Sequence, residues 1–107
     1  MERTLHLVHT TLETPEDAAR LAETLVGEGL TVCAQVGAAI RSWYRWQGRL
    51  ETGTEIPLLL KVRGDRLAAC CERLEALHPY ETPEVLVHPL GHVARGYLDW
   101  AYSEEGP

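Results

Sequence analysis

Residues 31–62 constrain the fold more than any other stretch, because two β-rich segments meet there at a single turn. The first segment covers 31–46 and is interrupted at Gly37, and the second covers 49–62. Between them, Gln47-Gly48 is a turn signal. The pattern predicts a long, bent antiparallel hairpin with its tip near Gln47-Gly48.

This predicted hairpin is longer than a domain of this size needs. It carries three of the seven aromatic residues, Trp43, Tyr44 and Trp46, and Thr52-Gly53 predicts a bulge or second bend inside it. Long exposed strands with aromatic side chains pair with another chain or aggregate. We therefore expect self-association, with hairpins of neighbouring subunits pairing at their edges. The alternative is that the hairpin folds back and buries these rings on its own sheet.

Two helices and two further strands account for most of the remaining chain. Thr14 is the expected N-cap of the first helix, with Pro15 at its first position, and Asp65 is the expected N-cap of the second helix. The elements expected outside the hairpin are a strand over 4–11, a helix over 15–27, a helix from Asp65 to His78, a strand over 84–89, a short helix within 93–102 and a polar tail over 103–107.

The resulting order, β-α-β-β-α-β followed by a short helix, predicts an α+β fold of the ferredoxin-like type. In this fold a four-stranded antiparallel sheet carries two helices on one face. The length of 107 residues predicts a single domain spanning residues 1–107. Such a fold is compatible with many functions, so function has to be argued from individual residues.

The charge and hydropathy of the chain argue against nucleic acid and membranes as partners. The formal net charge of −6 argues against nucleic acid, which requires clustered Lys and Arg. No run approaches the ~18 apolar residues of a membrane helix, so no membrane partner is expected. The N-terminus starts a strand rather than a signal peptide, which predicts an intracellular protein. Three cysteines, an odd number, do not predict a disulfide framework.

The stretch 78–84 is the densest in groups that could hold a proton, a metal or a polar ligand. It contains an imidazole, a phenol and two carboxylates, and Pro79 and Pro83 make it a stiff turn. The turn is either a structural connection between helix and strand or a functional site.

Cys33 could meet this turn at one end of the sheet or across subunits. A thiolate, an imidazole and carboxylates together suit copper or zinc. The candidate metal ligands are Cys33, His78, Glu81 and Glu84. The same groups could instead form a Cys-His nucleophile pair.

The other histidines and one lysine give weaker candidates. Strand alternation puts His6 and His9 on opposite faces, and His88 and His92 lie on either side of Gly91. Such histidines are either solvated or metal ligands. Lys61, within an apolar run, either extends from a sheet edge or meets an anion in a pocket, and could pair with Glu81 or Glu84.

Several segments in order carry a resemblance to one family. They are 30–36 with Cys33, the pattern Ser42-x-Tyr44-x-Trp46-x-Gly48, Glu55 followed by 58–61, His78-Pro79-Tyr80-Glu81 with Pro83-Glu84, and Tyr97-Leu98-x-Trp100. Over essentially its whole length the chain resembles the CutA family, the divalent-cation tolerance proteins. It departs from the family pattern at Gln35, where asparagine is usual, and at Trp43 and Ala101, where aliphatic residues are usual.

The resemblance implies a cytoplasmic ferredoxin-like homotrimer, similar in build to PII signalling proteins, with hairpins pairing between subunits. It also implies divalent metal tolerance, copper above all, in a family that is not an enzyme family. The first hypothesis is a non-enzymatic trimer that binds a divalent cation through Cys33, His78, Glu81 and Glu84. The second is a PII-like sensor of a small anionic ligand between subunits, bound by Lys61, Tyr44 and Trp46. The third is an enzyme with Cys33 as nucleophile.

Overall fold

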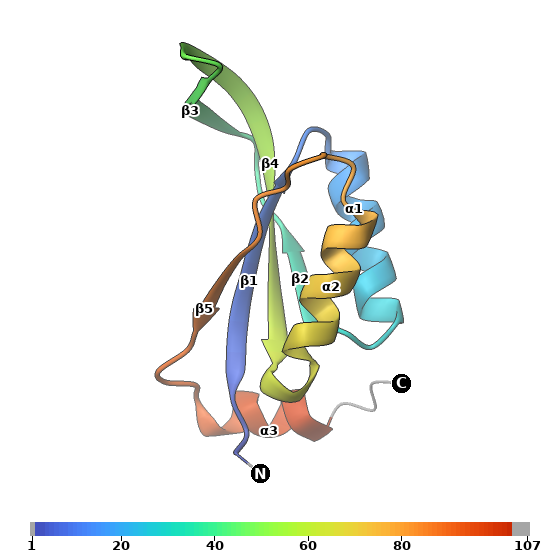
Figure 1. The fold of residues 1–107 in the computed structure, drawn as a ribbon. Coiled ribbons are helices and arrows are strands. Elements are labelled where there is room, and N and C mark those ends of the chain that lie inside the picture. Colours follow the sequence, from blue (N-terminus) through green and yellow to red (C-terminus); the bar gives the residue numbers. More distant parts are fainter. Residues whose placement is uncertain (1, 104–107) are drawn as a thin grey trace.

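The computed structural model describes residues 2–103, so four of the five residues of the expected polar tail lie outside the described part. Figure 1 shows the course of the chain. The elements in order are β1 (Leu5–Leu12), α1 (Pro15–Gly27), β2 (Cys33–Val36), β3 (Ile40–Trp46), β4 (Arg49–Arg63), a 3-10 turn (Gly64–Arg66), α2 (Leu67–Leu77), β5 (Leu86–Pro89) and α3 (Arg95–Ser103).

The strands form one antiparallel sheet with the order β2-β4-β1-β5, and β3 pairs with the outer part of β4. Helices α1 and α2 pack side by side on one face (Figure 1). The predicted α+β ferredoxin-like architecture is therefore confirmed. The opposite sheet face, which carries Leu7, His9, Leu59 and Lys61, is called the open face below.

The core lies between the sheet and the two helices. Along β4, buried and half-buried residues alternate, as expected for a strand with one face covered. Leu58 and Leu60 of β4 are fully buried with Leu25 of α1 and Leu74 of α2. These four leucines belong to one buried apolar cluster that joins both helices to the same sheet face.

Helix α3 packs against the end of the sheet where β1 begins (Figure 1). The phenol of Tyr102 donates to the carbonyl of Thr4 at 2.7 Å and accepts from the Thr4 N–H at 3.0 Å. Ala101 of the same helix is fully buried. No helix within residues 2–103 combines the length and apolar character needed to cross a bilayer.

The predicted first strand of the hairpin is divided into β2 and β3. Val36 pairs with Leu58 and Ile40 pairs with Glu55. The chain therefore advances four residues from β2 to β3 while β4 advances three. The extra residue lies in the 37–39 segment, where the Gly37 N–H still donates to the Pro57 carbonyl at 2.9 Å. Pro57 has no N–H to continue the ladder, which explains the break at this position.

The bulge predicted at Thr52-Gly53 is wrong, because these residues pair in regular register with Trp43 and Ser42. A Cβ added at Gly53 would lie 3.7 Å from the phenol oxygen of Tyr44, which is an ordinary van der Waals distance, so a larger residue would also fit at this position. The predicted position of the hairpin tip is confirmed. Gln47 and Gly48 both have positive φ, 52° and 78°, as the two central residues of a tight type I′ hairpin turn require.

One of the two predicted helix caps is present. The Thr14 hydroxyl accepts from the Asp17 N–H at 3.1 Å, which confirms it as the N-cap of α1. The prediction for Asp65 is wrong, since Arg66 occupies the N-cap position of α2. The carboxylate of Asp65 is instead paired with the Arg63 guanidinium at 2.6 and 2.9 Å, and a charged bidentate partner competes with capping.

Candidate functional site

His78 is a buried anchor for the proline-rich turn, with 7 % of its surface exposed. Its Nε2 lies 3.0 Å from both the Thr10 hydroxyl and the Thr11 carbonyl, and its Nδ1 accepts from the Tyr80 N–H at 3.2 Å. Since Nδ1 accepts, the ring proton sits on Nε2 and is donated to β1. Burial lowers the pKa of His78, so the neutral ring is favoured. Both nitrogens are thus engaged in holding the turn to β1.

Cys33 and His78 lie on opposite sides of the sheet. Cys33 pairs with Lys61, which pairs with Leu7, so its side chain is on the open face. His78 contacts Thr10, which is fully buried on the face covered by the helices. Within one subunit the structure therefore does not bring together the thiol and the imidazole of the predicted metal set or of the predicted nucleophile pair.

The turn delivers Glu84 to the open face. Glu81 is exposed on the turn itself, whereas the Glu84 carboxylate lies 3.5 Å from Nε2 of His9 on β1. The four predicted ligands thus occupy different places: Cys33 on β2, His78 under the turn, Glu81 in solvent and Glu84 beside His9. Across residues 2–103, no three His, Cys, Asp or Glu side chains already stand at metal-ligand spacing.

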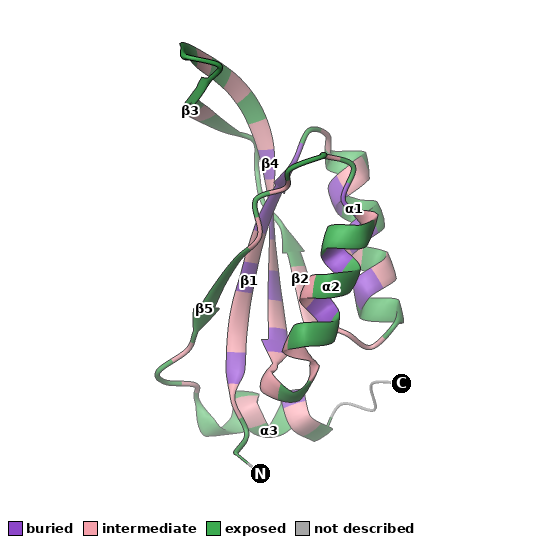
Figure 2. Cartoon of the chain, viewed as in Figure 1, coloured by how far each residue is buried: buried purple, intermediate pink, exposed green. Residues whose placement is uncertain are grey.

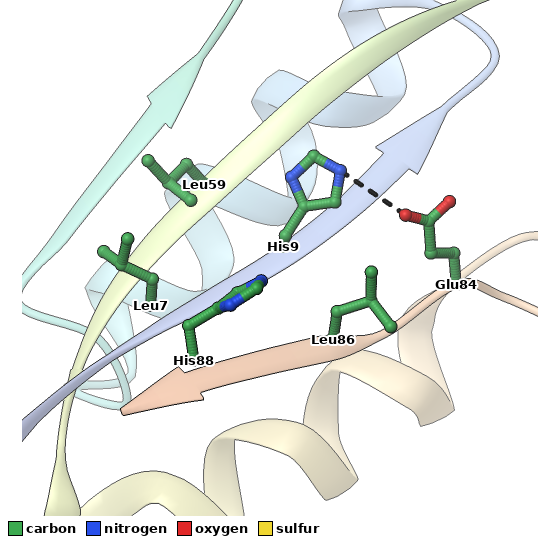
Figure 3. A pocket seen from close by; sticks show the side chains of 6 residues that line it. All are labelled: Leu7, His9, Leu59, Glu84, Leu86 and His88. Carbon is green, nitrogen blue, oxygen red and sulfur yellow. Dashed lines mark ion pairs between the residues drawn. The ribbon is translucent and has the colours of Figure 1, made fainter. Parts of the chain in front are cut away.

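An open hollow of about 480 Å³ surrounds His9 and Glu84 (Figure 3). It is lined by Leu7, His9, Leu59, Glu84, Leu86 and His88. His9 and His88 were separate candidates in the sequence, and the proximity of Glu84 to His9 was not predicted. The sequence carries no signal for this arrangement, because it depends on the register that pairs His9 with Leu86, two residues away from both Glu84 and His88.

The residues of the predicted anionic-ligand site are widely separated within one subunit. Lys61 lies on the open face, where its Nζ is 5.5 Å from the ring centroid of Tyr97 rather than beside Glu81 or Glu84. Tyr44 pairs with Glu51, which is ten residues from Lys61 along β4, or roughly 33 Å at the usual strand rise. These side chains can line one pocket only if the hairpin comes from a neighbouring subunit.

Glu55 fixes the hairpin to the body of the sheet. Its two carboxylate oxygens accept from the Ser42 hydroxyl at 2.6 Å and from the Thr11 hydroxyl at 2.9 Å. Burial raises the pKa of the neighbouring Tyr80, and the Glu55 charge adds to this shift. The proline-rich turn, the end of β1 and the base of the hairpin therefore meet at one polar junction.

Comparison with known proteins finds a match to the family described as CutA1 divalent ion tolerance protein, over residues 6–104. A relative from Thermus thermophilus named divalent-cation tolerance protein CutA is 36 % identical over 100 residues, covering 94 % of this chain and 97 % of that protein. A rice relative named Protein CutA 1, chloroplastic, is 34 % identical over 88 % of this chain, which spans only 53 % of the rice protein. The solved structure of CutA1 from Ehrlichia chaffeensis superimposes with a TM-score of 0.91 at 27 % identity, covering 96 % of both chains.

Proposed function

The chain belongs to the CutA1 divalent ion tolerance family, and we propose that it serves divalent-cation tolerance as a homotrimer that binds the cation itself, copper above all. In this proposal the protein is cytoplasmic and non-enzymatic. The family is named for tolerance rather than for a reaction. Moreover, Cys33 lies on the sheet face opposite His78, the imidazole that would activate it.

The exposed hairpin is the observation that carries the proposed assembly. Beyond the body of the sheet, Trp43, Trp46 and Leu50 are 65 %, 57 % and 75 % exposed, and this arm is largely green in Figure 2. Large apolar side chains held in water favour association, and an unpaired strand edge favours pairing with another chain. Three copies related by a closed rotation would cover these side chains without leaving a free edge.

The proposed cation binding rests on the family and on the pairing of Glu84 with His9. An imidazole beside a carboxylate is a donor set that suits copper and zinc. His78 contributes indirectly, since its hydrogen bonds to β1 hold the turn that carries Glu84. Neither group is fully buried, so an ion can reach both of them from solvent.

Titration of the metal-free protein with Cu²⁺ and with Zn²⁺ by calorimetry tests this function. We expect saturable binding of micromolar or tighter affinity. Cu²⁺ should bind more tightly than Zn²⁺, because sites with nitrogen and oxygen ligands generally have a higher affinity for Cu²⁺. Mg²⁺ is the matched control ion, since it retains its water and prefers oxygen ligands. Binding of Cu²⁺ and Zn²⁺ that is absent or never saturates would contradict the proposal.

One observation favours the PII-like alternative. Among the described residues, Lys61 has an aromatic ring rather than a carboxylate as its neighbour, so its charge is available to an anion. A hairpin from another subunit would bring Tyr44 and Trp46 near it. In this second candidate function, a small anionic metabolite binds between subunits.

A further inference from the structure

Two imidazoles and one carboxylate lie close to one another on the open face: His9 on β1, His88 on β5 and Glu84 just before β5. His9 lies directly opposite Leu86, and Leu7 lies directly opposite His88. In an antiparallel pair, the residues two positions before and after the opposite residue are diagonal neighbours, within reach of long side chains. Glu84 and His88 occupy these two diagonal positions relative to His9.

The carboxylate already stands beside the central imidazole. Oε2 of Glu84 is 3.5 Å from Nε2 of His9, and the exposed fractions of the two side chains are 44 % and 30 %. Figure 3 shows Glu84 on one side of His9 and His88 on the other, all turned toward the same hollow. Among the described residues, none forms a hydrogen bond or ion pair with the His88 side chain.

The surroundings of these polar groups are apolar. Leu7, Leu59 and Leu86 supply the remaining lining of the hollow. Aliphatic walls lower the local dielectric constant, which strengthens the attraction between a cation and a carboxylate. Two imidazoles with one carboxylate form a borderline donor set that suits Cu²⁺ and Zn²⁺ better than Ca²⁺ or Mg²⁺.

We propose that His9, Glu84 and His88 form the divalent-cation site of this protein. In residues 2–103 as described, no three His, Cys, Asp or Glu side chains lie close enough together to hold one ion. In this proposal the exposed His88 ring turns toward His9, which brings the three ligands within reach of the same ion. This inference rests on the proposed cation-binding function and assigns it to a site different from the set predicted around Cys33 and His78. Water completes the coordination shell of the ion.

The remaining histidines of the described chain are not part of this site. His6 pairs with Val62 and lies on the opposite face of the sheet from His9. His78 has both ring nitrogens in hydrogen bonds. His92 follows the end of β5 and does not line the hollow, which makes it a matched control for an exposed histidine.

Cu²⁺ and Zn²⁺ titrations of five variants test the assignment. His9→Ala, Glu84→Gln and His88→Ala are each expected to weaken binding at least ~10-fold, because even the loss of a group that only orients a metal ligand typically costs about 10- to 100-fold in affinity. His92→Ala and Cys33→Ser are expected to bind as the wild type does. Circular dichroism and light scattering on the same samples establish that fold and mass are retained, so that weakened binding reports on the ligands.

The possible outcomes separate this inference from the proposed function. If the wild type binds and the three hollow variants bind equally well, the site is overturned while cation binding stands. Unchanged affinity in His88→Ala alone overturns the three-ligand site. If Cys33→Ser loses binding while His9→Ala keeps it, the site is overturned in favour of the thiol. A wild type that binds neither ion contradicts both proposals.

Discussion

Replacing Trp46 with glutamate is expected to dissociate the proposed trimer into folded monomers. The predicted mass falls from about 36 kDa, for three chains of 12.0 kDa each, to 12.0 kDa. Trp46 is 57 % exposed at the tip of the hairpin and makes no contribution to the buried core of its own chain. A glutamate there would bring an unpaired carboxylate into the proposed interface, and burying such an ion costs several kcal/mol.

Light scattering measures this change directly, with Trp46→Phe as the matched control. Phenylalanine keeps an apolar ring at the same position, so a trimer is expected to persist in that variant. Circular dichroism should show the same secondary structure in both variants, because the core between the sheet and the helices is untouched. A mass of the glutamate variant equal to that of the wild type would rule out the hairpin as the assembly element.

Removal of the His78 side chain is expected to be the most destabilising single change at the proline-rich turn. His78→Ala leaves the Thr11 carbonyl and the Tyr80 N–H without their partner and opens a cavity under the turn. Together these effects are expected to lower the free energy of unfolding by about 3 kcal/mol. Urea unfolding at a fixed protein concentration measures the loss. The exposed His92→Ala serves as the control, and an equal effect of both changes would contradict the anchoring role.

The same side chain predicts a dependence of stability on pH. The pKa of His78 is lowered in the folded protein, chiefly by burial, so protonation favours the unfolded chain. Its contribution is fully present above the ordinary histidine value of 6.5 and is lost as the pH falls through the lower folded pKa. The wild type should therefore lose more stability than His78→Gln between about pH 7 and about pH 5. If the free energy of unfolding of the two proteins changes equally over this pH range, the predicted contribution of His78 is contradicted.

The sequence predicted the fold well because its signals are local. Alternation along β4, the Thr14 cap and the Gln47-Gly48 tip each depend on residues close together in the chain. Asp65 was misassigned because a capping pattern does not reveal a competing guanidinium two residues away. The bulge was placed on the wrong strand because a glycine inside a strand pattern does not by itself show an irregular backbone: Gly53 pairs in regular register, whereas the extra residue lies in the 37–39 segment.

The candidate site was harder to predict because it depends on strand register. Alternation placed His9 on the face opposite His6, but nothing within β1 indicates which residue of β5 it meets. The two prolines predict a stiff turn from the sequence alone. The attachment of this turn to Thr10 and Thr11 through His78 could not be predicted, because it depends on how α2 lies relative to β1. Because Cys33 and His78 are 45 positions apart in the chain, their separation by the sheet could be seen only in three dimensions.

Electron paramagnetic resonance and optical absorption of one sample of the wild-type protein, loaded with one Cu²⁺ per subunit, test the central claim most directly. The account predicts a single copper species with nitrogen coupling from two imidazoles, supplied by His9 and His88, and no thiolate-to-copper absorption band. A spectrum equal to that of copper free in buffer, or an intense thiolate band that disappears in Cys33→Ser, would contradict it.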